Sequence, residues 1–169
     1  MAVGDLIIRN ARPEELDEAA RVLVESYQEY LEVLSTERWE AYRQNIMDVR
    51  SRVGESDLII AEMEGQILGS VTFYPAGSRR ERGGWPPEWA GVRLVGVHPD
   101  ARGQGIARAL MDECIRRCRD QGTPTLALHT TEIMTVAREM YERMGFVRID
   151  EHDFRSGDAG GAMAYRLDL

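Results

Sequence analysis

The stretch that decides the fold is Leu94-Val95-Gly96-Val97-His98-Pro99-Asp100-Ala101-Arg102-Gly103-Gln104-Gly105-Ile106-Ala107-Arg108-Ala109-Leu110. Its valine-rich start predicts a short strand, which ends at Pro99 because proline has no N–H to donate to a sheet. Gly103 and Gly105 permit backbone angles and close approaches that a side chain would block. Apolar residues at helical spacing follow, so a helix is predicted to begin near Gly105.

The loop before this helix predicts an anion-binding site. The first N–H groups of a helix have no intrahelical acceptor, and the helix dipole is positive at that end. Phosphate or pyrophosphate suits such a site best. Two other phosphate-binding patterns fit less well. A Walker loop ends in Gly-Lys-Ser/Thr, which is absent here. A dinucleotide fingerprint needs an acidic residue at the end of the next strand, which instead ends Leu128-His129-Thr130.

The same stretch resembles the acyl-CoA-binding motif of the GNAT superfamily of N-acetyltransferases. That motif is Arg or Gln, two residues, Gly, one residue, and then Gly or Ala, and Arg102, Gly105 and Ala107 stand at its positions. The resemblance covers nearly the whole chain, because the order of the predicted elements also matches the family. It implies acetyl-CoA as cosubstrate.

The resemblance also implies which residues hold the donor. The backbone of the loop and the first helical turn would cradle the pyrophosphate. These residues are Arg102, Gly103, Gln104, Gly105, Ile106, Ala107 and Arg108. The backbone of Val95, Gly96 and Val97 would pair with the pantetheine arm, with Gly96 at a bulge. In the family a backbone N–H at the position of Val97 polarises the thioester carbonyl, as in an oxyanion hole. The alternative for Val95 and Val97 is a plain core strand.

The element pattern predicts an α+β fold. Its order is β-α-α-β-β-β-α-β-α-β-β, which gives a GNAT-like mixed central sheet of six to seven strands flanked by about four helices. The expected strands are 6–9, 57–64, 67–74, 92–98, 125–130, 146–154 and 162–169, and the expected helices are 13–27, 37–53, 105–121 and 133–144. The segment 75–90 is long for a loop of a compact domain, which suggests a functional or mobile segment.

Composition limits the function classes. A chain of 169 residues suits one domain, 1–169. A net charge of −8 argues against a broad grip on nucleic acid, although basic residues cluster at 79–82 and 102–119. No apolar run approaches the roughly 20 residues that span a bilayer, and no signal peptide is evident. We therefore expect a cytoplasmic protein without nucleic-acid or membrane partners. The resemblance allows a homodimer.

The two cysteines, Cys114 and Cys118, predict core thiols. They lie four residues apart on one predicted helix, a poor geometry for a disulfide. A zinc site would lack its other ligands. We therefore expect no metal, and no acyl-enzyme intermediate on cysteine.

Tyr141 is the first catalytic candidate. It begins Tyr141-Glu142-Arg143-Met144-Gly145-Phe146, which resembles the family signature Tyr-Glu-x-x-Gly-Phe. In the family this phenol protonates the departing CoA thiolate. The chemistry fits, since a thiol titrates near 8.5 and a phenol near 10. The alternative is a helix tyrosine that packs its ring and points its hydroxyl outward. Many relatives carry Asn seven residues earlier, where this chain has Met134; Thr130, Thr131 or Glu132 could substitute.

The second catalytic role to assign is that of the general base. Many relatives use a Glu on the central strand, but Val92-Arg93-Leu94-Val95 has none. His129, at the end of the next strand, is the best replacement because histidine titrates near neutral pH. The alternative is a structural histidine. His98 is more suited to holding the turn, and Glu62 and Glu88 have no motif behind them.

Acceptor recognition has the weakest signal. In the family it involves the first two helices and the loops before the central strand and between the last strands. Tyr27, Tyr30, Trp39 and Trp85 lie in those regions, with Trp89 and the acidic residues Asp150, Glu151 and Asp153. An aromatic and acidic lining would suit an amine. The sequence thus predicts an N-acetyltransferase that acts by direct attack of a small or peptide amine. A non-catalytic acyl-CoA-binding protein and an interaction domain without CoA remain as rivals, and the intact loop motif argues against the second.

Overall fold

A computed structural model describes residues 4–78, 84–155 and 161–169. The chain forms two compact units, Met1–Thr72 with Leu94–Glu113, and Phe73–Arg93 with Cys114–Leu169. Strands β3 (Gln66–Tyr74) and β4 (Ala90–Val97) and helix α3 (Ile106–Asp120) have residues in both units. The basic cluster at 79–82 lies outside the described residues.

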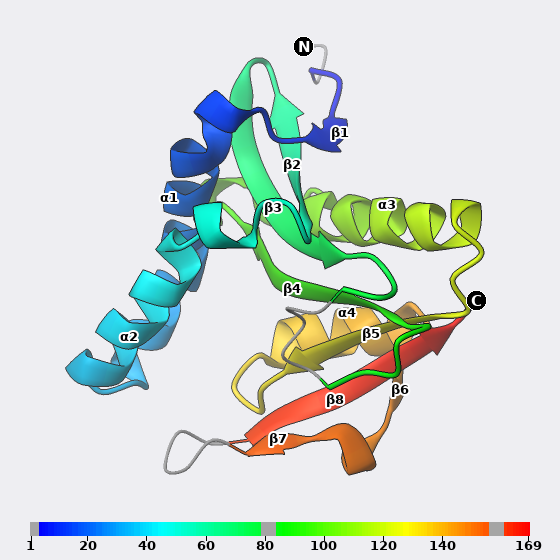
Figure 1. Cartoon of the computed structure of the whole chain (residues 1–169). Helices are drawn as coiled ribbons and strands as arrows, with labels where there is room; N and C mark the ends of the chain where they lie inside the picture. Colours follow the sequence, from blue (N-terminus) through cyan, green and yellow to red (C-terminus); the bar gives the residue numbers. More distant parts are fainter. Residues whose placement is uncertain (1–3, 79–83, 156–160) are drawn as a thin grey trace. The chain divides into compact units, whose positions relative to one another are not determined.

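Within the described ranges, hydrogen bonds join seven strands in the order β1-β2-β3-β4-β5-β8-β6, and β7 pairs with β8 beside this path (Figure 1). The remaining strands are β1 (Ile7–Asn10), β2 (Asp57–Met63), β5 (Thr125–Thr130), β6 (Val147–Arg148), β7 (Phe154–Arg155) and β8 (Gly161–Asp168). The remaining α-helices are α1 (Leu16–Tyr27), α2 (Thr36–Met47) and α4 (Thr135–Arg143). Since β1 is antiparallel to β2 and β4 is parallel to β5, the sheet is mixed and the predicted α+β class is confirmed.

In the first unit, α1 covers β2 and β3. Its apolar stripe places Ala19 and Val22 against Ile60 and Ile67, as expected for residues three apart on one helix face. Helix α2 runs beside α1 (Figure 1). It ends at Met47 rather than near residue 53, because the Arg52 guanidinium donates to the carbonyls of Asn45 and Ile46 at 2.7 and 3.0 Å.

Gly96 lies where α1 comes closest to β4. A Cβ added there would overlap Oγ of Ser26 and lie 2.6 Å from Cδ1 of Leu23. The unusual backbone angle of β4 is at Leu94, with a positive φ of 55°, and not at Gly96, where the sequence predicts a bulge. Gly96 is therefore required for close helix–strand packing rather than for an unusual backbone angle.

Gly96→Ala is expected to lower the free energy of unfolding by about 1–3 kcal/mol, the usual cost of overpacking a core. Urea denaturation would measure it. Because Ser26 Oγ is the atom overlapped, the cost should be smaller in a Ser26→Ala background. An equal cost in both backgrounds would contradict this account of the packing.

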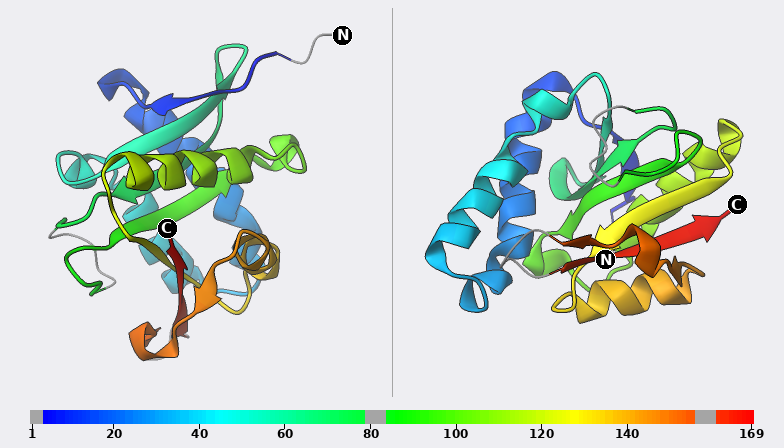
Figure 2. Two further views of the ribbon diagram at one scale, coloured as in Figure 1. Left: turned by 90° about the vertical axis from the view of Figure 1, so that its right-hand side faces the viewer. Right: turned by 60° about the horizontal axis from the view of Figure 1, so that its bottom comes forward.

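In the second unit, β5 pairs antiparallel with β8 from Thr125↔Asp168 to Thr130↔Met163. Figure 2 shows these two strands side by side. On its other edge β5 pairs with residues 90–92 of β4. Of the described residues, Leu126 and Leu128 of β5 are among the most buried in the chain.

The single strand expected over 146–154 is wrong. Two-residue strands β6 and β7 flank a 3-10 turn at Asp150–His152. The Asp153 carboxylate accepts the N–H of Ala164 at 2.9 Å and also pairs with Arg148. A side chain thus replaces a backbone partner of β8, and the ladder is interrupted there.

Candidate functional site

Near the end of β4, the backbone N–H groups of two residues point to the edge of the strand that is away from β3. The N–H of His98 donates to the carbonyl of Leu68 on β3 at 2.7 Å. Successive residues of a strand turn their N–H and C=O groups to opposite edges. The backbone N–H and C=O groups of Gly96 therefore point toward β3. The position of the Gly96 carbonyl oxygen beside Gly69 of β3 also indicates this. The N–H groups of Val95 and Val97 point to the opposite edge.

One backbone group of this edge already has a partner. The hydroxyl of Tyr27 donates to the carbonyl of Val95 at 3.0 Å. A carbonyl has two lone pairs, so Val95 keeps acceptor capacity. Tyr27 therefore holds the candidate donor strand in place from α1.

The loop after β4 has the backbone that the sequence predicts. Gly103 and Gly105 have φ values of 76° and 77°, and a Cβ at either position would meet no atom within 4 Å. These angles strongly favour glycine. The site thus has a glycine-dependent backbone with open space around it, as a phosphate cradle requires.

Helix α3 begins directly after these glycines. The N–H of Ala109 donates to the carbonyl of Gly105 at 3.0 Å, so the N–H groups of Ile106, Ala107 and Arg108 precede the helical hydrogen-bond ladder. The first turn contains no acidic residue. An anion at this helix end would meet N–H donors and the positive end of the helix dipole.

Arg102 anchors the loop to the end of α1. Its guanidinium donates to the carboxylate of Glu29 at 2.9 Å and to the carbonyl of Ser26 at 2.8 Å. His98 makes a similar contact, with Nε2 2.9 Å from Glu25 and Nδ1 accepting the N–H of Asp100. The structure thus places the motif arginine against α1, and His98 holds the turn as expected.

Three of the aromatic acceptor candidates lie in the first unit. The side chains of Tyr27 and Trp39 are buried, each in a residue that is 7% exposed. The ring of Tyr27 packs against those of Tyr30 and Tyr42, with centroids 5.9 and 5.6 Å apart. Burial, reinforced by Glu29, raises the pKa of Tyr30 above its ordinary value. Tyr30 is the more accessible of the three.

His129, in the second unit, is held at its ring face and at one nitrogen. Its Nε2 lies 2.8 Å from the carbonyl oxygen of His152. A carbonyl can only accept, so Nε2 carries the proton and Nδ1 is the basic atom. The ring stacks on Trp85 with centroids 4.5 Å apart. Burial lowers the pKa of His129, and this effect outweighs the opposite influence of the His152 carbonyl and of Asp153.

Tyr141 is buried in the second unit. It is 6% exposed, and its ring packs against Phe146, with centroids 5.7 Å apart. The nearby substitutes for the missing Asn differ in their contacts. The hydroxyl of Thr130 lies 3.6 Å from the sulfur of Met134. The hydroxyl of Thr131 is buried, with no hydrogen-bond partner in the described part of the chain.

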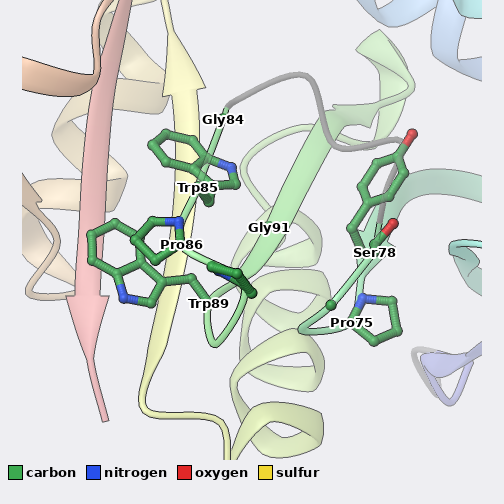
Figure 3. Close-up of a pocket in the computed structure, with 10 residues that line it drawn as sticks. Pro75, Ser78, Gly84, Trp85, Pro86, Trp89 and Gly91 are labelled. Carbon is green, nitrogen blue, oxygen red and sulfur yellow. The ribbon is translucent and has the colours of Figure 1, made fainter.

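The second unit also contains an aromatic pocket of about 200 Å³. Figure 3 shows Trp85, Pro86 and Trp89 on one side, Pro75 and Ser78 on the other, and Gly91 of β4 between them. Sequence reasoning missed that Ser78 lines this pocket and that the ring of His152 contacts both tryptophans. The Trp-Pro-Pro-Glu-Trp run at 85–89 is the signal that could have directed attention to this loop.

The comparisons place the chain in a family. The model of the acetyltransferase (GNAT) family matches residues 18–146. The chain therefore belongs to the GNAT acetyltransferase family, as its loop motif predicts.

Individual relatives show how far the likeness extends. A mycothiol acetyltransferase from Cellulomonas flavigena is 38% identical over 115 residues, which are 64% of this chain and 33% of that protein. The match thus spans about a third of this curated relative's length.

Two solved structures share the fold. PaiA N-acetyltransferase from Thermoplasma acidophilum, in complex with coenzyme A, has a TM-score of 0.77 at 16% identity and covers 98% of this chain and 99% of its own. A GNAT family acetyltransferase from Brucella melitensis, in complex with acetyl-CoA, has a TM-score of 0.64 at 21% identity, with 98% and 89% covered. At these identities the likeness shows the fold alone.

Within residues 4–78, 84–155 and 161–169, no group of three or more His, Cys, Asp or Glu side chains is arranged to hold a metal ion. In the same ranges, no helix combines the length and the apolar character needed to cross a bilayer.

Proposed function

We propose that the protein is an N-acetyltransferase that transfers an acetyl group from acetyl-CoA to a primary amine by direct attack in a ternary complex. The observation that carries the proposal is the pair of left-handed glycines, Gly103 and Gly105, immediately before α3. They expose the N–H groups of the first helical turn to a pyrophosphate. The solved relatives that contain CoA or acetyl-CoA support this choice of donor.

The strand edge supplies the second part of the donor site. The N–H of Val97 would donate to the thioester carbonyl and stabilise the charge that develops on its oxygen during attack. The backbone of Val95 would pair with the pantetheine arm, next to its hydrogen bond from Tyr27. The side chain of Arg102 would not bind the phosphate itself. Its hydrogen bonds to Glu29 and to the carbonyl of Ser26 would instead hold the loop in the shape that binds the phosphate.

Two side chains of the second unit would move the protons. The amine nitrogen attacks the carbonyl carbon and forms the N–C bond as the C–S bond breaks. Nδ1 of His129 takes a proton from the amine, and the hydroxyl of Tyr141 gives a proton to the departing thiolate. The chain thus supplies an acceptor for the proton of the amine and a donor for the proton that the thiolate gains.

The role of His129 predicts a pH dependence. A lowered pKa means that the ring loses its proton at a lower pH, so the basic form is already present at neutral pH. The ascending limb of kcat/KM against pH should therefore have its midpoint below 6.5, the ordinary value for histidine. His129→Gln should lower kcat/KM at least 10-fold and remove this limb. An unchanged limb in the variant would assign the base to another residue.

A non-catalytic acyl-CoA-binding protein is the second candidate. The absence of Glu from residues 92–95 of β4 and the presence of Met134 favour it. Calorimetry with acetyl-CoA, followed by a thiol-release assay with alkylamines, arylalkylamines, polyamines and peptides, separates the two. Binding with acceptor-dependent thiol release supports the enzyme. Binding without release from any acceptor supports the second candidate, and no binding by folded, CoA-free protein overturns both.

A further inference from the structure

His129, the proposed general base, is oriented by a neighbouring turn of the chain. Its Nε2 bonds to the carbonyl of His152, which belongs to the 3-10 turn Asp150–His152 between β6 and β7 (Figure 1). We propose that the ion pair of Arg148 and Asp153, which flanks this turn, sets the protonation form and the basicity of His129. This step rests on the proposed function. Neither residue touches the reacting atoms, so both are positioning residues.

Both ends of the turn are attached to one residue of β8, Ala164. At the first end, the N–H of Ile149 donates to the carbonyl of Ala164 at 3.0 Å. At the other end, the carboxylate of Asp153 accepts the N–H of Ala164 at 2.9 Å. Inside the turn, the N–H of His152 donates to the carbonyl of Ile149 at 3.1 Å. His152 therefore lies in a segment that is fixed before and after it.

Ala164 is also the partner of His129 across the sheet. The N–H of Ala164 is used by Asp153, on the edge of β8 that is away from β5. His129 and Ala164 are therefore a non-hydrogen-bonded pair, the arrangement that brings opposite residues of antiparallel strands closest together. The residue that carries the turn thus lies opposite the histidine, and the His152 carbonyl comes within reach of its ring.

The guanidinium of Arg148 donates to both oxygens of the Asp153 carboxylate. The two side chains are only 32% and 25% exposed. A two-pronged contact of this kind fixes the angle between the groups as well as their distance. Nη1 of Arg148 also donates to the carbonyl of Ala164 at 3.2 Å. Asp153 is a poor base itself, because Arg148, with help from the N–H of Ala164, lowers the pKa of its carboxyl group.

The charge of Asp153 has a second effect on His129. Burial lowers the pKa of His129, and Arg93 and the ring of His152 act in the same direction. The His152 carbonyl and the charge of Asp153 oppose them. Because Nε2 donates to that carbonyl, Nδ1 is the basic atom. The ion pair thus favours one tautomer through the turn, and Asp153 keeps the ring more basic than burial alone would.

Asp153→Asn tests the ion pair without acetyl-CoA. Asparagine keeps an oxygen for the N–H of Ala164, but its NH₂ group cannot accept from Arg148. NMR of the imidazole nitrogens of the whole protein reports the tautomer and the titration midpoint. The chain has three histidines, and His129→Gln identifies the signal. We expect the Nε2–H form in wild type, and in Asp153→Asn a mixture with the Nδ1–H form and a midpoint at lower pH. An unchanged tautomer and midpoint in folded Asp153→Asn protein overturn the proposal.

Three further variants separate the ion pair from charge alone. Asp120→Asn removes a carboxylate that pairs with Arg116 on α3 and should leave His129 unchanged. Arg148→Lys keeps the charge but loses the two-pronged contact, so it should also produce the Nδ1–H form. It carries the test if Asp153→Asn does not fold. The double variant should change the tautomer little more than either single variant, because the two residues act as one unit. Additive effects would contradict this.

Kinetics connects the turn to the reaction. In Asp153→Asn, the high-pH plateau of kcat/KM should fall about fivefold or more, and the ascending limb should move to lower pH together with the NMR midpoint. A loss of folded protein alone would lower the plateau without moving the limb. An NMR midpoint that moves while the limb stays shows that His129 is not the base and overturns the inference. No acceptor-dependent thiol release by the wild type overturns the proposed function instead.

Discussion

Gly105→Glu is expected to weaken acetyl-CoA binding at least 100-fold, about 2.8 kcal/mol, as measured by calorimetry. Two effects combine. Any residue other than glycine is strained at the φ of 77° found here. The new carboxylate would also stand at the helix end that is proposed to hold the pyrophosphate, where its charge repels the ligand.

Two variants separate these effects. Gly122→Glu carries the same charge change at a glycine with a φ of 68° and open space around it, just beyond the other end of α3. It should leave acetyl-CoA binding unchanged. Gly105→Ala has strain without charge and should fall between the two. Equal binding by Gly105→Glu and wild type would show that the loop is a structural turn rather than a phosphate cradle.

Tyr141→Phe is expected to lower kcat by about 100-fold or more, the usual contribution of a positioned general acid. Phenylalanine keeps the ring contact with Phe146, so stability and the affinity for acetyl-CoA should change little. The loss should therefore appear in kcat rather than in KM. Steady-state thiol release with a saturating amine would measure it.

Tyr165→Phe is the matched control. Tyr165 is another buried tyrosine of the second unit, and its hydroxyl donates to Glu142 at 3.0 Å. Its loss should leave kcat within a few-fold of wild type. If Tyr141→Phe were as active as Tyr165→Phe, the phenol of Tyr141 would have no part in protonating the thiolate.

The elements around the central stretch could be predicted because their causes are local. Pro99 follows the strand, Gly103 and Gly105 take the left-handed angles, and α3 begins at Ile106. Each of these features depends on the conformational range of one residue or on apolar spacing along one helix. The family assignment rests on the same stretch, and the matching family model confirms it.

The region 146–154 could not be predicted in the same way. Its apolar and β-branched residues favour a strand. The carboxylate of Asp153, however, accepts a hydrogen bond from the backbone N–H of Ala164 on β8. The two residues are 11 positions apart, and nothing in the local pattern indicates that they meet. Gly96 shows the same limit, because its role depends on the approach of Ser26 and Leu23 from α1.

The sequence by itself determined the order of the elements, the glycine-dependent loop and the family, because these depend on local backbone preferences and on spacing along the chain. Only the tertiary structure decided how the candidate side chains are used. It turned Arg102 toward Glu29, fixed the proton of His129 on Nε2 through the His152 carbonyl, and gathered Trp85, Trp89 and Ser78 around one pocket. Hydrogen bonds and ring contacts act over a few ångströms, so their partners are known only once distant segments of the chain have been brought together.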